Sequence, residues 1–119
     1  MAAPLNSRLK IKVQLLAGGE IAMGPGKAEL LDWIGRTGSI SAAARSMGVS
    51  YRRAWLMLDA MNRGFAEPVV QTAHGGAKGG GATITVFGER VLTAFRALEA
   101  DLEAAAERHR AVLLRTLAK

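Results

Sequence analysis

The sequence contains no cysteine among its 119 residues, which excludes disulfide bridges and thiolate metal ligands. Aromatic residues make up only 5% of the chain, so a core must be built mainly from aliphatic side chains and methionine. No apolar run approaches the roughly 20 residues that a membrane-spanning helix needs. The N-terminal stretch carries basic side chains among its apolar ones, unlike a signal peptide. These absences favour a single-domain cytoplasmic protein without a membrane partner.

The sequence also lacks an arrangement of side chains that would support catalysis. No carboxylate pair and no nucleophile with a neighbouring base stands out. The two histidines, His74 and His109, do not belong to a metal-ligand cluster. We therefore expect no enzymatic activity, no cofactor and no bound metal.

The whole chain has a formal net charge of +6. Most of this positive charge lies in the first three quarters of the chain. Residues 1–88 contain ten Lys or Arg against five Asp or Glu, whereas residues 89–119 contain six against five. A basic front part indicates a polyanionic partner, and a nearly neutral rear part indicates a different role. Charge alone fits simple solubility equally well.

The hydrophobic pattern predicts short strands on either side of a group of helices. Residues 8–15 alternate polar and apolar side chains, so Leu9, Ile11, Val13 and Leu15 would share one face of a strand. A glycine pair would then turn the chain into a short second strand, which completes an N-terminal hairpin. The other expected elements are helices at 27–36, 41–47 and 51–63, strands at 69–73 and 82–87, and one long helix at 89–118.

Residues 38–58, GSISAAARSMGVSYRRAWLML, have the features of a helix-turn-helix. Three consecutive alanines allow two helices to cross closely, and Gly48 can adopt the left-handed backbone of the turn. Ser39 or Ser41 would cap the helix before the turn. Ser50 would cap the helix after it and could also donate to a phosphate.

The helix after the turn is amphipathic in a way that suits a recognition helix. Arg52 and Arg53 stand at its N-terminal end, where recognition helices reach base edges. Arginine can bind a guanine with two hydrogen bonds or hold a phosphate, and the sequence leaves open which arginine does which. An ordinary solvated face is the alternative. The expected core side holds Tyr51, Ala54, Trp55, Leu58, Met61 and Phe65, and the expected outer side holds Arg52, Arg53, Ala60 and Arg63.

The glycine-rich segment HGGAKGGG, residues 74–81, joins the two later strands and allows three interpretations. As the wing of a winged helix it would lay Lys78 along a phosphate or in the minor groove. As a nucleotide-phosphate loop it fails, because no Lys-Ser or Lys-Thr follows and no helix opens there. An inert flexible loop is the third interpretation.

The long C-terminal helix carries apolar residues at alternating spacings of four and three, which is a heptad seam. A helix of 30 residues is about 45 Å long, so on a domain this small the seam would protrude and need a partner helix. A homodimer would also place two recognition helices roughly 34 Å apart, one DNA turn. Packing of the first half against its own domain is the alternative, and we expect both. The seam consists of Val91, Phe95, Leu98, Leu102, Ala105, His109 and Val112.

Two stretches, GSISAAARSMGVSYRRAW and HGGAKGGGATITVFGERVL, resemble the N-terminal domain of ModE-type molybdate-responsive regulators. The resemblance implies a helix-turn-helix, a glycine-rich wing and the start of a dimer helix. It departs from the full-length family, because residues 89–119 read as one helix and not as an oxyanion-binding module. DNA binding is therefore implied, direct molybdate sensing is not, and a separate molybdate sensor is a candidate partner. The expected DNA-binding residues are Ser41, Ser50, Tyr51, Arg52, Arg53, Arg63 and Lys78.

Together these features predict a mostly α (α+β) winged helix-turn-helix with an N-terminal β-hairpin. Residues 1–88 would form the DNA-binding domain, and residues 89–119 the dimerisation helix. The predicted function is a sequence-specific DNA-binding transcriptional regulator, a repressor acting as a homodimer on double-stranded DNA. Two alternatives stay open: a protein-interaction module that does not touch DNA, and a small-oxyanion sensor built on a winged-helix dimer.

Overall fold

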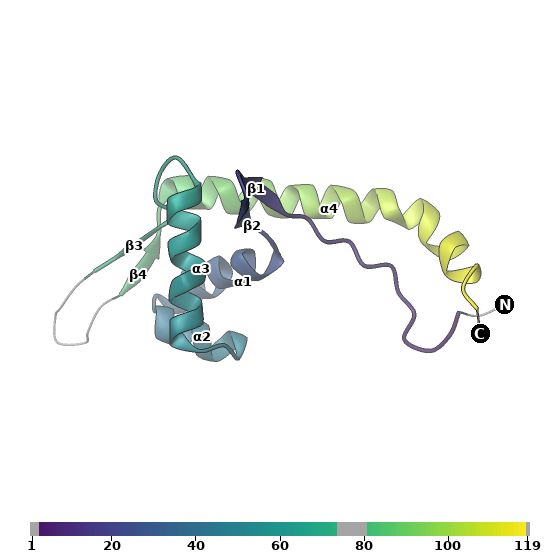
Figure 1. Cartoon of the computed structure of the whole chain (residues 1–119), viewed down its shortest axis with the longest axis horizontal. Helices are drawn as coiled ribbons and strands as arrows, with labels where there is room; N and C mark the ends of the chain where they lie inside the picture. Colours follow the sequence, from purple (N-terminus) through teal and green to yellow (C-terminus); the bar gives the residue numbers. More distant parts are fainter. Residues whose placement is uncertain (1–2, 74–80, 119) are drawn as a thin grey trace.

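The computed structural model describes residues 3–73 and 81–118, and it is mostly helical with two small hairpins (Figure 1). Its extents are 60 × 28 × 25 Å, because one helix projects well beyond the rest. In Figure 1 this helix, α4, lies along the long axis and α3 runs across it. In chain order the elements are β1 (Leu15–Ala17), β2 (Glu20–Met23), α1 (Pro25–Thr37), α2 (Ile40–Met47), α3 (Tyr51–Gly64), β3 (Val70–Thr72), β4 (Ala82–Ile84) and α4 (Val86–Arg115).

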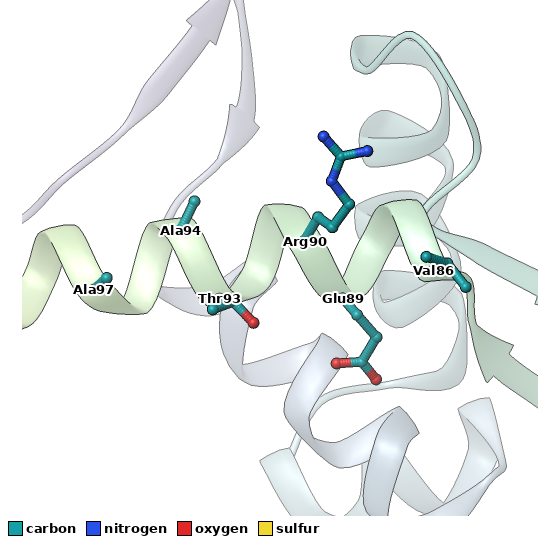
Figure 2. Close-up of a pocket in the computed structure, with 6 residues that line it drawn as sticks. All are labelled: Val86, Glu89, Arg90, Thr93, Ala94 and Ala97. Atoms are coloured by element: carbon teal, nitrogen blue, oxygen red, sulfur yellow. The ribbon is translucent and has the colours of Figure 1, made fainter.

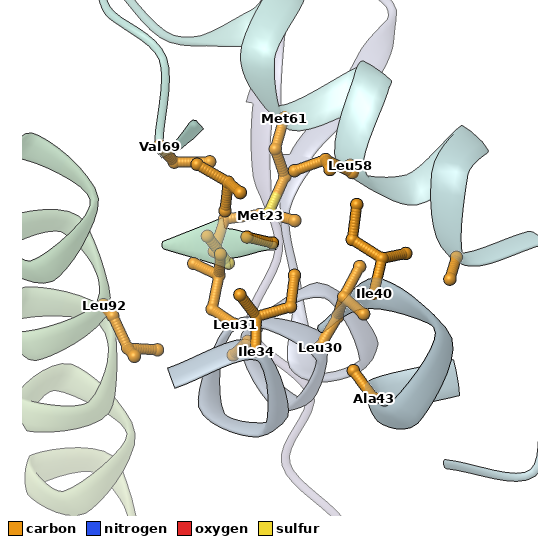
Figure 3. Close-up of a cluster of buried hydrophobic side chains, with 14 of the residues drawn as sticks. Met23, Leu30, Leu31, Ile34, Ile40, Ala43, Leu58, Met61, Val69 and Leu92 are labelled. Atoms are coloured by element: carbon orange, nitrogen blue, oxygen red, sulfur yellow. The ribbon is translucent and has the colours of Figure 1, made fainter. Parts of the chain in front are cut away.

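One aliphatic core lies between α1, α2, α3 and the first turns of α4 (Figure 3). None of its buried side chains is polar or charged within the described residues. Burial of apolar surface at about 25 cal/mol per Å² is thus the main force that fixes the helices relative to one another. The largest fully buried side chains are Met23, Leu30, Leu31, Ile34, Leu58, Met61 and Val69.

The three central helices start and stop where local chemistry favours it. Pro25 occupies the first turn of α1, where its missing N–H breaks no hydrogen bond. Gly38 ends α1 and Gly48 ends α2, both with the positive φ that glycine adopts without strain. Ser39 caps α2 by accepting a hydrogen bond from the Ala42 N–H at 3.1 Å. Of the two serines considered for this cap, Ser39 is therefore the one used.

The two hairpins are separate antiparallel sheets of two strands each. The N-terminal hairpin pairs β1 with β2, and the later hairpin pairs Val70 with Ile84 and Thr72 with Ala82. The Ala82 N–H also donates to the Gly38 carbonyl at 2.9 Å, which ties β4 to the turn between α1 and α2. These positions define a winged helix-turn-helix, and the fold class predicted from the sequence is confirmed.

The strand predicted at residues 8–15 is wrong in extent, because a ladder begins only at Leu15. Residues 8–14 are extended, and Leu9, Ile11 and Val13 are half-buried while their neighbours are exposed. The predicted alternation is therefore present without a paired strand. Leu15 does not follow this alternation, because it is 52% exposed at the point where the register of the hairpin shifts.

The predicted boundary between the last strand and the long helix is also wrong by a few residues. The strand expected at 82–87 ends at Ile84, and the helix expected to start at 89 starts at Val86. Thr85 is responsible, because its hydroxyl accepts the Gly88 N–H at 2.9 Å and so caps α4. The helix also ends at Arg115 and not at residue 118.

Candidate nucleic-acid interface

The turn between α2 and α3 holds the start of α3 in a fixed orientation. Gly48 has φ +71°, and its N–H donates to the carbonyls at the end of α2. The Val49 N–H donates to the Ala44 carbonyl at 3.0 Å. The Ser50 hydroxyl then caps α3 by accepting the Arg53 N–H at 3.0 Å. This is the local geometry of a helix-turn-helix, and it leaves the first turn of α3 exposed.

Two arginines stand on this exposed first turn. Arg52 and Arg53 are both exposed, and the first turn of α3 contains no acidic residue. Within residues 3–73 and 81–118, neither guanidinium forms an ion pair. Their charges are therefore available to an external anion.

A third cation comes from α1. Burial, and next the positive charge of Arg53, lower the pKa of Lys27, while Glu20 acts in the opposite direction. The two helices meet here, because a Cβ added to Gly26 would lie 3.6 Å from the Met57 methyl carbon. Lys27, Arg52 and Arg53 together are called the basic patch below. Its positive charges repel one another, so an anion placed among them would be stabilised.

Arg63, the third cation predicted on α3, is placed differently. It lies on the last turn of the helix and pairs with Asp59 at 2.9 Å and with Glu20 at 3.2 Å. The hydrogen bond that Arg63 donates to Asp59, and next the charge of Glu20, raise the pKa of Arg63 above its usual range. Its charge is thus compensated within the chain, unlike the charges of the basic patch.

Tyr51 and Trp55 do not lie in the core, and this part of the prediction is wrong. Tyr51 is 52% exposed and Trp55 is 37% exposed. The core side of α3 is centred on Ala54, Leu58 and Met61, and a 100° step per residue leaves the two aromatic side chains at its edge. Their rings contact each other edge to face, with centroids 6.2 Å apart. The exposure of Tyr51 keeps its hydroxyl accessible for contact with a phosphate.

Asn62 positions the wing hairpin against α3. Its side chain accepts the Val69 N–H at 2.8 Å and donates to the Val70 carbonyl at 3.4 Å. Asn62 lies on the same flank of α3 as Tyr51 and Trp55, so β3 emerges on that flank. Lys78 and His74, which the sequence placed in the loop of this wing, lie outside the described residues.

The heptad seam divides into a packed part and an exposed part. Phe95 is buried and Val91 packs against the core, so the first turns of α4 belong to the domain. Leu98 is 45% exposed and Val112 is 56% exposed. The remaining members, Leu102, Ala105 and His109, are exposed as well. The second half of the seam thus projects from the domain without a cover among the described residues.

Outside this face, α4 carries a shallow open hollow over its first turns (Figure 2). Glu89 and Arg90 project from it in different directions. The hollow is lined by Val86, Glu89, Arg90, Thr93, Ala94 and Ala97.

No cluster of three or more potential metal ligands occurs among the described residues. No helix in the described part of the chain is long and apolar enough to cross a membrane.

Three residues of this surface were not predicted from the sequence. Lys27 joins the basic patch only because α1 packs on α3, and Asn62 holds the wing only because the chain returns to the end of α3. Leu56 is 57% exposed on the outer side of α3, although leucine alone gives no signal of exposure. The 3.6-residue period of α3 could have placed Leu56 opposite Leu58 and Met61.

Comparison with known proteins finds relatives that match most of this chain. The chain is 54% identical over 80 residues to the molybdenum-pterin-binding protein MopB of Rhodobacter capsulatus, which covers 67% of this chain and 30% of that protein. It is 39% identical over 87 residues to the molybdenum transport protein ModE of Azotobacter vinelandii, covering 73% of this chain and 32% of the relative. It is 36% identical over 92 residues to the DNA-binding transcriptional dual regulator ModE of Escherichia coli strain K12, covering 77% and 33%. No protein-family model matches the chain.

The chain is homologous to ModE-type proteins over their N-terminal third, which confirms the predicted resemblance. It spans about a third of the length of the relatives that it matches. The names of these three relatives describe regulation, molybdenum transport and molybdenum-pterin binding, and none of them describes an enzyme. The activity of a whole relative thus comes to this chain only as a proposal.

Proposed function

We propose that this protein is a sequence-specific DNA-binding transcriptional regulator that acts as a homodimer on double-stranded DNA. The observation that carries the proposal is the exposed first turn of α3, where Arg52 and Arg53 have no acidic neighbour on that turn. The N-terminal residues of a recognition helix contact base edges in the major groove. A relative that is named a DNA-binding regulator matches the same part of the chain. Such a regulator, which we take to be a repressor, would act in the cytoplasm.

The neighbours of these arginines would bind the DNA backbone. Lys27 lies beside Arg53, so a phosphate between them would relieve their repulsion. Ser50 stands at the positive end of α3, which favours an anion. Tyr51, Ser41 and Lys78 complete the proposed backbone contacts, whereas the compensated Arg63 would contribute little.

We propose that residues 1–88 bind DNA and that residues 89–119 form the dimerisation helix. The exposed part of the seam supports this division, because two copies that pair there would bury Leu98, Leu102 and Val112 from both chains. A two-fold dimer would present the two basic patches to successive major grooves, roughly 34 Å apart. An interaction module without DNA binding would use the same seam, and its basic patch would bind no DNA.

A salt titration tests DNA binding itself. A fluorescent fragment from upstream of the protein's own transcription unit is compared with a scrambled duplex of the same length and composition. We expect tighter binding to the genomic fragment, with an affinity that falls steeply as salt rises, because each neutralised phosphate releases a counterion. Equal binding to both duplexes would contradict sequence specificity, and no binding at low salt would favour the interaction module.

The same titration, repeated with molybdate, addresses regulation. The hollow on α4 offers one acidic side chain, Glu89, and one basic side chain, Arg90, which project in different directions and so do not form a cluster of positive charge that would hold an oxyanion. We therefore propose that a separate sensor, and not the described residues, responds to molybdate. Molybdate should leave the DNA affinity of this chain unchanged. A shift at molybdate concentrations far below the background salt would instead support an oxyanion sensor within the chain.

Substitution of Leu98 by aspartate is expected to separate the dimer. It places a charge in an apolar seam, and burial of an unpaired charge is strongly unfavourable. Analytical ultracentrifugation should show a monomer for Leu98→Asp. The control is Ala100→Asp, because Ala100 is exposed and lies two residues on, about 200° around the helix. A dimer that survives Leu98→Asp would show that the copies pair elsewhere.

A further inference from the structure

An apolar side chain stands in the middle of the exposed side of α3. Leu56 is 57% exposed and lies on the second turn of the helix. At 100° per residue it points about 160° away from Leu58 and 140° away from Met61, the two residues that anchor α3 in the core. Leu56 therefore projects outward, where α3 would meet a partner.

The charges around Leu56 favour a nucleic acid as that partner. Arg52 lies one turn earlier on the same side of the helix and is free of ion pairs within the described residues. One turn later lies Asp59, whose carboxylate is paired with Arg63 a further turn along the helix. Leu56 thus stands between an available cation and a compensated pair. A polyanion drawn to the basic patch would bring its surface into contact with this leucine.

Leucine can neither donate nor accept a hydrogen bond, so it can recognise only an apolar feature of a base pair. In the major groove the edges of guanine, cytosine and adenine present donors and acceptors, whereas thymine also presents its C5-methyl group. Four residues of helix rise about 6 Å, which is close to two base-pair steps. The contact would thus fall within about two base pairs of the position that Arg52 reaches.

We propose that Leu56 determines part of the operator sequence by packing on the C5-methyl group of a thymine in each half-site. This inference rests on the proposed function, because it requires α3 to enter the major groove. It adds a requirement that the arginines cannot impose, since their hydrogen bonds do not sense a methyl group. A half-site would combine a guanine with a thymine about two base pairs away.

Uracil substitution tests the contact. A tight-binding duplex is first selected by the wild-type protein from a pool with a randomised centre. Each thymine is then replaced by deoxyuridine, which removes only the C5-methyl group and keeps base pairing. We expect one position in each half-site where the wild-type protein loses about fourfold in affinity, as one buried carbon contributes about 0.8 kcal/mol. Leu56→Ala should bind the thymine and uracil duplexes equally.

The matched control is Leu16→Ala, because Leu16 is 60% exposed but lies on β1. That variant should keep the full loss at the sensitive thymine. Leu56→Gln, which keeps the length of the side chain, should lose the discrimination as Leu56→Ala does. A wild-type protein that is insensitive to every uracil, or a sensitivity that persists in both Leu56 variants, would overturn the inference while DNA binding stands. A pool that yields no preferred duplex would overturn the proposed function together with it.

Discussion

Replacement of Gly88 by alanine is expected to lower the stability of the folded domain more than replacement of any other described glycine by alanine. Gly88 is buried in the first turn of α4, where the helix passes close to Val69, the residue just before β3. A Cβ at this position would lie 2.2 Å from the Val69 carbonyl oxygen and 2.9 Å from an Ile84 methyl group. The first of these atoms is backbone, so rotation of a side chain cannot relieve the clash.

The size of the effect follows from two opposing contributions. Alanine favours a helix over glycine by about 1 kcal/mol. Overpacking in a close contact costs about 1–3 kcal/mol, and more when backbone must move. We expect a net loss of about 2 kcal/mol, which lowers the melting temperature of a domain of this size by roughly 10 °C. Thermal unfolding followed by circular dichroism measures this difference.

The control for this experiment is Gly26→Ala. Gly26 also lies in the first turn of a helix, but its added Cβ would meet only a flexible methionine at ordinary contact distance, 3.6 Å. This variant should be as stable as the wild type or slightly more so. If Gly88→Ala melts at the wild-type temperature, the start of α4 does not pack on Val69 as described.

Replacement of Arg52 and Arg53 by alanine is expected to abolish sequence-specific DNA binding and to leave the fold intact. Both side chains are exposed, so their removal should change stability by less than about 0.5 kcal/mol. An arginine that binds guanine with two hydrogen bonds contributes about 1–3 kcal/mol to discrimination, which is roughly 5- to 150-fold. The single variants reveal which arginine has this role.

The two roles give different results in the same binding assay. Loss of the base-reading arginine should weaken binding to the genomic fragment and leave the scrambled duplex almost unchanged. Loss of a phosphate-binding arginine should weaken both and reduce the salt slope by about one. Arg108→Ala, which removes one exposed positive charge from α4, is the control. Wild-type affinity and preference in the double variant would exclude the basic patch as the DNA-binding surface.

The helix-turn-helix could be predicted from sequence because its determinants are local. Gly48 supplies the positive φ of the turn, and Ser50 caps the helix only three residues before the N–H that it accepts. Neither requires knowledge of distant contacts. The seam was predictable for the same reason, since its period is set by one helix alone. Its division at Leu98 into packed and exposed halves depends on where the domain ends in space.

The errors arose where distant segments meet. Trp55 has an apolar side chain at a helical spacing from Leu58, yet it is 37% exposed, because the wing hairpin meets this flank of α3 about two turns further along, at Asn62. The strand expected at residues 82–87 is too long, because threonine is a residue type that favours strands. In the structure the Thr85 hydroxyl instead caps α4 and donates to the Pro68 carbonyl. The sequence does not reveal that Lys27 joins the basic patch, because its position beside Arg53 depends on the packing of α1 on α3.

Guanine methylation interference tests the central claim that α3 reads bases in the major groove. Dimethyl sulfate methylates guanine N7, the major-groove atom to which an arginine would donate. The selected duplex is sparsely methylated, bound by the wild-type protein and separated into bound and free fractions. We predict two clusters of interfering guanines with centres one helical turn apart, about 10–10.5 base pairs, as a dimer with two α3 helices requires. Specific binding without interference at any guanine N7 would contradict the claim.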